Sequence, residues 1–129
     1  MPRLYYALDL RDDPAAIAEY EDWHRPGVVW PEVVASIRAA GIEDMEIFRT
    51  GNRLVMMVQV PDGYDAGSRR AADADNPRVQ AWEGLMDRYQ QRLPWARPGE
   101  KWVPMRGIFS LKEALAGSGT TPRSGGADG

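Results

Sequence analysis

The order of strand-like and helix-like segments constrains the fold of this chain more than any other feature of its sequence. Residues 3–10, RLYYALDL, alternate so that one face is apolar, which predicts a half-buried strand. Residues 44–50 alternate in the same way, and residues 53–60 are apolar on nearly both faces. A Gly-Asn turn separates these two segments, so we predict a hairpin. Residues 102–111, WVPMRGIFSL, are predicted to form the last strand.

Prolines and glycines indicate where the helices between these strands begin and end. Pro14 follows two aspartates and predicts a helix start, and Pro26 predicts that this helix ends at about His24. Pro31 predicts the start of a second helix, which Gly41 closes. Together the two short helices are expected to form one broken crossover between the first and second strands.

A longer helix is predicted to begin at Asn76-Pro77, after a polar stretch, residues 64–75, that holds a short helix and a loop. Its buried stripe recurs at helical spacing and comprises Val79, Trp82, Met86, Tyr89 and Leu93. The overall order is then βαββαβ, the ferredoxin-like pattern of an α+β fold. Because the strand at residues 53–60 is apolar on both faces, the second face of the sheet also needs cover. A second copy of the sheet would supply it, which predicts a homodimer.

Length, charge and composition limit the class of protein. The 129 residues suit one domain, predicted over residues 1–115, and the glycine- and serine-rich segment 116–129 is predicted to be a disordered tail. A net charge of −3 without a basic block argues against a nucleic-acid partner. No stretch approaches the ~20 apolar residues of a membrane span or resembles a signal peptide, so we expect a cytoplasmic protein. With no cysteine and one histidine, neither a disulfide nor a metal site is expected.

The single histidine lies beside a tyrosine at the end of a predicted helix. Tyr20 and His24 are four residues apart, so their side chains project from the same helix face. An imidazole exchanges protons near neutral pH, which suits acid–base catalysis. The helix dipole would favour the protonated form, whereas burial against Trp23 or Trp30 would favour the neutral form. The sequence leaves both that balance and a purely structural alternative open, in which the pair only caps and packs the helix.

Other aromatic and polar side chains are candidates for contacts with a ligand. Each of the five tryptophans could fill the core or stack on the apolar face of a sugar. Glu46 and Arg49 lie on one predicted strand with their side chains on opposite faces, so one could enter a pocket while the other is solvated. The sequence contains no glycine-rich phosphate loop and no Gly-x-Ser-x-Gly elbow, which argues against nucleotide binding and against a serine hydrolase.

These motifs together resemble a known family. The spacing Tyr20-x-x-x-His24, a proline-containing bend and a Trp-Pro-Glu beginning at Trp30 resemble the motif of the L-rhamnose mutarotase family, over about residues 4–111. The stretches ALDLRDDPAAIAEYEDWHRPG and NPRVQAWEGLMDRYQQRLPWA are similar to the L-fucose mutarotase branch. The resemblance implies a dimeric α+β barrel that interconverts the α and β anomers of a 6-deoxy-L-hexose, a monosaccharide, without a cofactor.

The resemblance also implies roles for particular residues. His24 matches the proton donor of the family, Tyr20 a residue that contacts the sugar, and Trp82 a residue that lines the sugar site. In the expected mechanism His24 protonates the ring oxygen and Tyr20 orients the hydroxyls. The other predicted substrate contacts are Trp30, Trp95, Met45 and Glu46.

Departures from the rhamnose-type pattern favour a different sugar. Met45 stands where the rhamnose enzymes carry a sugar-binding tyrosine, and Ala81 stands where they carry the first of two adjacent tryptophans. The bend after His24 is also two residues longer. L-fucose is therefore the first expected substrate and L-rhamnose the alternative. Two other functions stay open, a monooxygenase-like or haem-degrading dimeric barrel and a non-catalytic sugar-binding protein.

Overall fold

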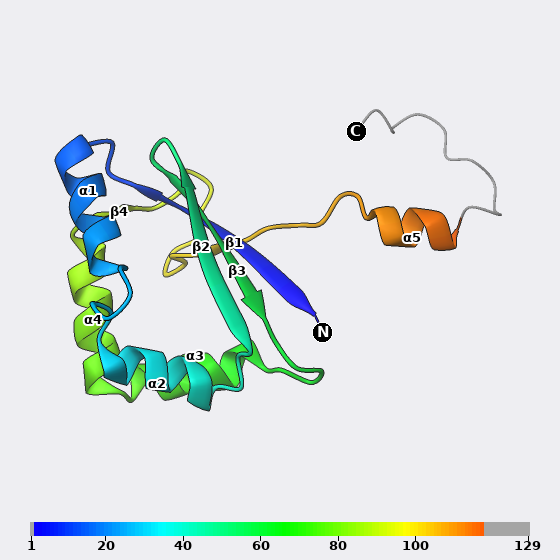
Figure 1. The fold of residues 1–129 in the computed structure, drawn as a ribbon, viewed down its shortest axis with the longest axis horizontal. Coiled ribbons are helices and arrows are strands. Elements are labelled where there is room, and N and C mark those ends of the chain that lie inside the picture. The colour runs from blue at the N-terminus through cyan, green and yellow to red at the C-terminus, as the bar shows by residue number, and fades with distance from the viewer. Residues whose placement is uncertain (1, 118–129) are drawn as a thin grey trace.

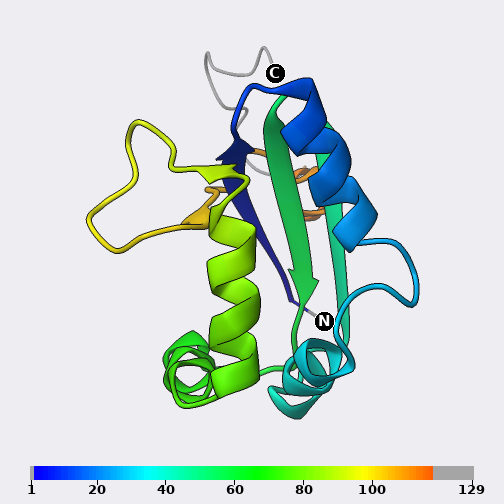
Figure 2. The ribbon, with the colours of Figure 1, turned by 90° about the vertical axis from the view of Figure 1, so that its left-hand side faces the viewer.

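The computed structural model describes residues 2–117, in which one sheet carries four helices on one side (Figure 1). Figure 2 looks onto the side of the sheet that carries α1 to α4. Within the described residues, no helix is long and apolar enough to cross a membrane. In chain order the elements are β1 (Arg3–Leu10), α1 (Pro14–Trp23), α2 (Pro31–Ala39), β2 (Asp44–Thr50), β3 (Arg53–Gln59), α3 (Ala66–Ala74), α4 (Pro77–Asp87), β4 (Gln90–Gln91), β5 (Val103–Pro104) and α5 (Leu111–Ala116).

The sheet has the antiparallel topology that the βαββαβ order predicts. Its strand order is β2-β3-β1-β4, and β5 also pairs with β1. The first and third long strands therefore lie in the centre, as in ferredoxin-like folds. The predicted hairpin is confirmed by the pairing of β2 with β3, which runs from Asp44 opposite Gln59 to Thr50 opposite Arg53.

The register of β1 and β3 explains where the core forms. Leu8 lies opposite Leu54, and Leu4 lies opposite Val58. Because directly opposite residues share a sheet face, these even-numbered side chains all point toward the helices. Leu8, Leu54 and Val58 are 0%, 2% and 1% exposed, so the helix-facing side of the sheet is the centre of the core.

Proline and aspartate set the helix ends that position the candidate site. Asp13 caps α1 by accepting a hydrogen bond from the Ala15 backbone N–H at 3.0 Å, and Pro14 is the first helical residue. The helix stops at Trp23, so His24 is its C-terminal cap, as predicted. Gly41 adopts a φ of +86° after α2, which is a left-handed conformation that glycine accepts without strain.

The prediction that the longest helix continues to Leu93 is wrong. Helix α4 ends at Asp87, and the chain then pairs with β1 through β4, with Gln90 opposite Leu10. Tyr89 and Leu93 are nevertheless buried, at 6% and 3% exposure. After Asp87 the helix gives way to a turn at Tyr89 and to the short pairing of Gln90 and Gln91 with β1. A spacing of three to four residues in the sequence could not distinguish this arrangement from a continued helix.

The prediction of a strand over residues 102–111 is also wrong in its extent. Only Val103–Pro104 forms β5, which pairs with Ala7 and Tyr6 of β1. After a last bond from the Met105 N–H to the Tyr5 carbonyl, the chain leaves the sheet as an extended arm. The arm ends in α5, which the sequence analysis did not anticipate. Residues 118–129 of the predicted tail lie outside the described residues.

Candidate functional site

Three aromatic rings, from the end of α1 and the start of α2, meet around Trp82 of α4. Trp82 lies on α4 and is 6% exposed. The centroids of the Trp23, His24 and Trp30 rings lie 6.2, 5.7 and 5.3 Å from it, all at steep angles to its plane. Edge-to-face contacts of this kind are favourable for aromatic rings. The end of α1, the start of α2 and the middle of α4 are therefore held together by Trp82, which the family resemblance implies as part of a sugar site.

The imidazole of His24 is oriented by a bond to its own helix. Its Nδ1 atom lies 2.7 Å from the carbonyl oxygen of Tyr20. A carbonyl oxygen only accepts hydrogen bonds, so Nδ1 must carry the proton. In the neutral ring Nε2 is then the unprotonated nitrogen, able to accept a proton from a ligand.

Burial decides the protonation balance that the sequence left open. It lowers the pKa of His24 from its ordinary value of 6.5, and the bond to the Tyr20 carbonyl only partly opposes this shift. The loss of hydration on burial disfavours the protonated imidazole. At neutral pH His24 is a neutral base rather than a proton donor at rest.

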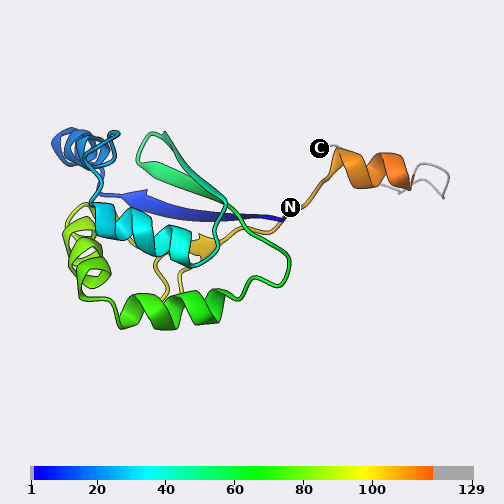
Figure 3. The same ribbon diagram turned by 60° about the horizontal axis from the view of Figure 1, so that its bottom comes forward.

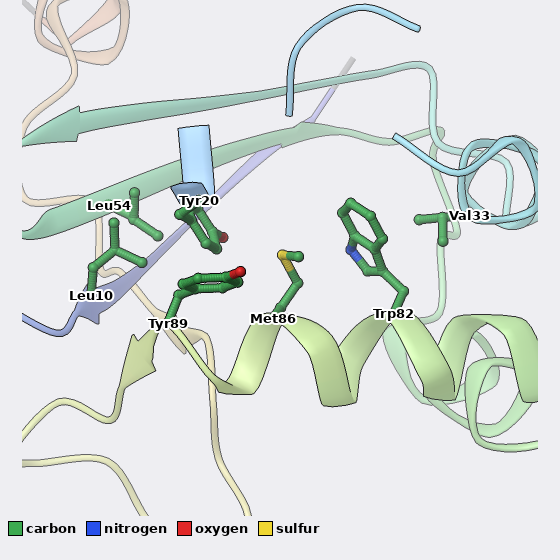
Figure 4. Packing of buried hydrophobic residues seen from close by; sticks show 7 residues of the cluster. All are labelled: Leu10, Tyr20, Val33, Leu54, Trp82, Met86 and Tyr89. Carbon is green, nitrogen blue, oxygen red and sulfur yellow. The ribbon is translucent and has the colours of Figure 1, made fainter. Parts of the chain in front are cut away.

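Tyr20 presents a neutral phenol beside this imidazole. Its side chain is buried, and the centroid of its ring lies 4.4 Å from that of His24. Burial is the main cause that raises the pKa of Tyr20 to about 12, opposed by a hydrogen bond from Gln90, while Glu83 adds to the rise. Because Gln90 Nε2 donates to the phenol oxygen at 3.2 Å, the phenol's own proton is free to point elsewhere. Figure 4 shows the hydroxyls of Tyr20 and Tyr89 both pointing toward Met86 and Trp82.

A hydrogen-bonded chain holds α1 against the residues that follow α4. The indole N–H of Trp23 donates to the hydroxyl of Tyr89 at 3.1 Å, and that hydroxyl donates to the carboxylate of Glu19 at 3.1 Å. No local pattern in the sequence indicates these bonds, because their partners are 66 and 70 residues apart. It fixes the relative positions of the helix that carries His24 and the helix that carries Trp82.

The other predicted substrate contacts divide into two groups. Trp30 belongs to the ring cluster, and the guanidinium of Arg78 lies over its ring, 4.2 Å from the centroid. Met45 lies on the helix-facing side of β2, but it packs against a second core cluster that contains Met56 and Val58. Its place is therefore on the correct side of the sheet, outside the ring cluster.

Trp95 and Glu46 do not lie with His24 in this chain. Trp95 is 60% exposed, with the guanidinium of Arg53 5.5 Å from its ring centroid. Glu46 lies opposite Met57 on the sheet face away from the helices. Arg49, three residues further along β2, lies on the helix-facing side and pairs with Glu21 of α1.

Two hollows in the surface lie outside the ring cluster. One, of about 360 Å³, is lined in part by Glu19 and Tyr89, and therefore borders the hydrogen-bonded chain described above. The other, of about 470 Å³, lies between α2 and α3. Neither is lined by Tyr20, His24 or Trp82. The rings around Trp82 contact one another edge to face, and the side chain of His24 in this cluster is only half-buried.

Comparisons with known proteins find relatives over most of the chain. The family model described as L-rhamnose mutarotase matches residues 3–111. The L-fucose mutarotase of Xanthomonas campestris pv. campestris is 57% identical over 116 residues, covering 90% of this chain and 93% of that protein. The L-rhamnose mutarotase of Acidiphilium cryptum is 48% identical over 108 residues, covering 81% of this chain and 95% of that protein.

A solved structure has the same fold. The crystal structure of L-rhamnose mutarotase from Formosa agariphila superposes with a TM-score of 0.62 at 20% identity, covering 86% of this chain and 99% of that one. At this identity the likeness concerns the fold alone. The family model spans most of the chain, and the relatives match nearly their whole length. This chain therefore belongs to the L-rhamnose mutarotase family.

Proposed function

We propose that this protein is an isomerase that interconverts the α and β anomers of a 6-deoxy-L-hexose, with L-fucose as its preferred sugar. The observation that carries the proposal is the oriented, neutral imidazole of His24 beside the neutral phenol of Tyr20. At neutral pH such a pair offers an uncharged proton acceptor beside an uncharged hydrogen-bond donor. The choice of L-fucose is supported by the relative of that name, which is 57% identical.

In the proposed reaction one nitrogen both takes and returns the proton. Nε2 of His24 accepts the proton of the anomeric hydroxyl, and the electrons of that O–H bond form the C1 carbonyl as the bond from C1 to the ring oxygen breaks. The imidazolium then protonates the released ring oxygen. Rotation about the C1–C2 bond and the reverse steps give the other anomer. The resting form of His24 is thus a base, and it becomes the donor expected from the sequence only during the reaction.

Tyr20, Trp82 and Trp30 are proposed to hold the sugar during these steps. The phenol of Tyr20 donates to a sugar oxygen, and the indoles of Trp82 and Trp30 offer apolar edges and faces to the ring carbons. Met45, Trp95 and Glu46 are weaker candidates, since none of them lies in the ring cluster. A cytoplasmic location is likewise part of the proposal.

Polarimetry on freshly dissolved sugar tests this function and its sugar preference. Catalytic amounts of protein should speed the approach of α-L-fucose to its equilibrium rotation more than that of α-L-rhamnose. A larger effect on L-rhamnose would overturn the sugar assignment and leave mutarotation in place. Acceleration of neither sugar would overturn the function itself.

The pH dependence of the rate should follow from the lowered pKa of His24. We expect kcat/KM to stay level from about pH 9 down past the ordinary imidazole pKa, and to fall only at lower pH, where the base becomes protonated. The raised pKa of Tyr20, about 12, predicts no loss on the alkaline side of this range. The profile is measured by polarimetry after subtraction of the spontaneous rate. A rate that rises as the pH falls from 7 toward 5 would contradict a neutral resting base.

The C-terminal arm supports the further proposal of a homodimer. Figure 1 and Figure 3 show the arm and α5 extending away from the body of the protein. Ile108 and Phe109 on this arm are 91% and 74% exposed. On the sheet face away from the helices, Tyr5 and Phe48 are 43% and 55% exposed. An apolar arm and an apolar sheet face that do not meet within one chain are complementary between two copies.

Charges placed in the arm should separate such a dimer. The double variant Ile108→Asp with Phe109→Asp removes two apolar side chains per chain, so its dissociation constant should rise on the order of a thousandfold or more. Light scattering after size exclusion measures the mass, with Lys112→Asp on the same arm as the control. A monomeric wild type, or a double variant that stays dimeric, would contradict the arrangement.

A further inference from the structure

The side chain of Gln90 contacts Tyr20 of the candidate site. Neither the sequence around Gln90 nor its position in a strand predicts a contact with a ligand. It lies on β4 opposite Leu10, and so on the helix-facing side of the sheet. Its Nε2 atom donates to the phenol oxygen of Tyr20 at 3.2 Å. The residue before it, Tyr89, and the residue opposite it both belong to the buried cluster that surrounds Tyr20 (Figure 4).

The other end of the same amide has no partner. Oε1 of Gln90 is buried without a hydrogen bond in the part of the chain that the structure describes. Buried polar atoms in folded proteins are nearly always paired, because an unmade bond in an apolar environment is costly. If the amide were turned over, Oε1 would accept from Tyr20 and Nε2 would be the buried atom without a partner. In either orientation one polar end of the amide is unpaired next to the catalytic phenol.

We propose that Gln90 is a substrate-recognition residue, whose amide holds the phenol of Tyr20 in position and whose carbonyl oxygen accepts a hydrogen bond from a hydroxyl of the sugar. The inference rests on the proposed function and goes beyond it, since it names a further contact with the sugar. A hydroxyl fits because Oε1 is an acceptor that needs a donor, and because the surrounding side chains are apolar or uncharged.

The contact requires a local rearrangement of side chains. An atom without exposure is met by a ligand only after its neighbours shift, and changes of rotamer at binding sites are common while the backbone stays in place. The unpaired atom then destabilises the empty site and is satisfied in the complex. Residues that destabilise the free protein but form favourable contacts with a ligand are characteristic of functional sites.

Opposite effects on stability and on sugar binding distinguish this role from a structural one. Gln90→Met keeps the volume but removes both polar ends of the amide. Its melting temperature should equal or exceed that of the wild type, because the buried unpaired acceptor is gone. Its KM for L-fucose, or its Kd from quenching of tryptophan fluorescence, should rise about tenfold. Gln91→Met, at the exposed neighbour on β4, is the matched control and should change neither quantity.

Deoxygenated sugars identify the hydroxyl concerned. Among L-fucose analogues that lack one ring hydroxyl, one should bind the wild type about tenfold more weakly, and that difference should disappear in Gln90→Met. A Gln90→Met protein that exchanges and binds L-fucose like the wild type overturns the role of Gln90 and leaves the proposed function standing. A loss of melting temperature with unchanged kcat/KM would show a structural role only. A wild type that neither binds nor exchanges these sugars overturns the proposed function and this inference with it.

Discussion

Replacing His24 with asparagine should abolish nearly all catalysed anomer exchange while the protein stays folded. The amide N–H of asparagine can still donate to the Tyr20 carbonyl, so the C-terminal cap of α1 is preserved. The atom lost is Nε2, which is the proton acceptor in the proposed reaction. Since positioned acid–base groups contribute about 10²- to 10⁴-fold, kcat should fall by that factor toward the spontaneous rate. Polarimetry or NMR measures the rate, and circular dichroism measures the fold.

Two further variants distinguish proton transfer by His24 from a role as a hydrogen-bonding group only. His24→Gln places an amide near the position of Nε2, and should be as inactive as asparagine because an amide does not exchange protons at neutral pH. Asp22→Asn changes an exposed neighbour in a loose surface ion pair with Arg25 and should leave the rate unchanged. Full activity in either His24 variant would eliminate His24 as the acid–base group.

Replacing Trp82 with alanine should lower the free energy of unfolding by about 3–5 kcal/mol, the range for large-to-small changes in a core. Trp82 is 6% exposed and contacts the rings of Trp23, His24 and Trp30. Its removal leaves a cavity where three helices meet. Denaturation in urea, followed by circular dichroism, measures the change.

The size of this effect means that alanine cannot test a sugar contact at Trp82. Trp82→Phe keeps an aromatic ring in the cluster and should remain folded, with a raised KM for L-fucose as its main defect. Trp95→Ala is the control for loss of a tryptophan, because that side chain is 60% exposed and should cost little stability. Wild-type stability in Trp82→Ala would contradict the central place of Trp82 in the packing.

Local signals predicted most of the fold, because the elements concerned are determined by nearby residues. Pro14 and Pro31 each start a helix where predicted, and Gly51 lies in the turn of the predicted hairpin. The unexpected helix α5 also had a local signal. Ser110 accepts a hydrogen bond from the Glu113 N–H at 3.2 Å, and serine three residues before glutamate is the sequence pattern of a capped helix start.

The rest of the site depended on contacts between distant segments, which a single sequence does not specify. Tyr20, His24 and Trp82 were predicted and do come together. The contact of Gln90 with Tyr20 spans 70 residues and follows from the register of β4 against β1. Trp95 is a residue type that often contacts sugars, but it does not belong to the ring cluster around Trp82. Residue type indicated the chemistry, and the topology decided which residues share a site.

The most direct test of the account is NMR exchange spectroscopy on the anomeric protons of L-fucose at equilibrium, with catalytic amounts of the wild type and, separately, of His24→Asn. We expect exchange cross-peaks between the α and β signals with the wild type and only the spontaneous rate with the variant. Equal exchange rates in the two samples, or no exchange above the spontaneous rate with the wild type, would contradict it.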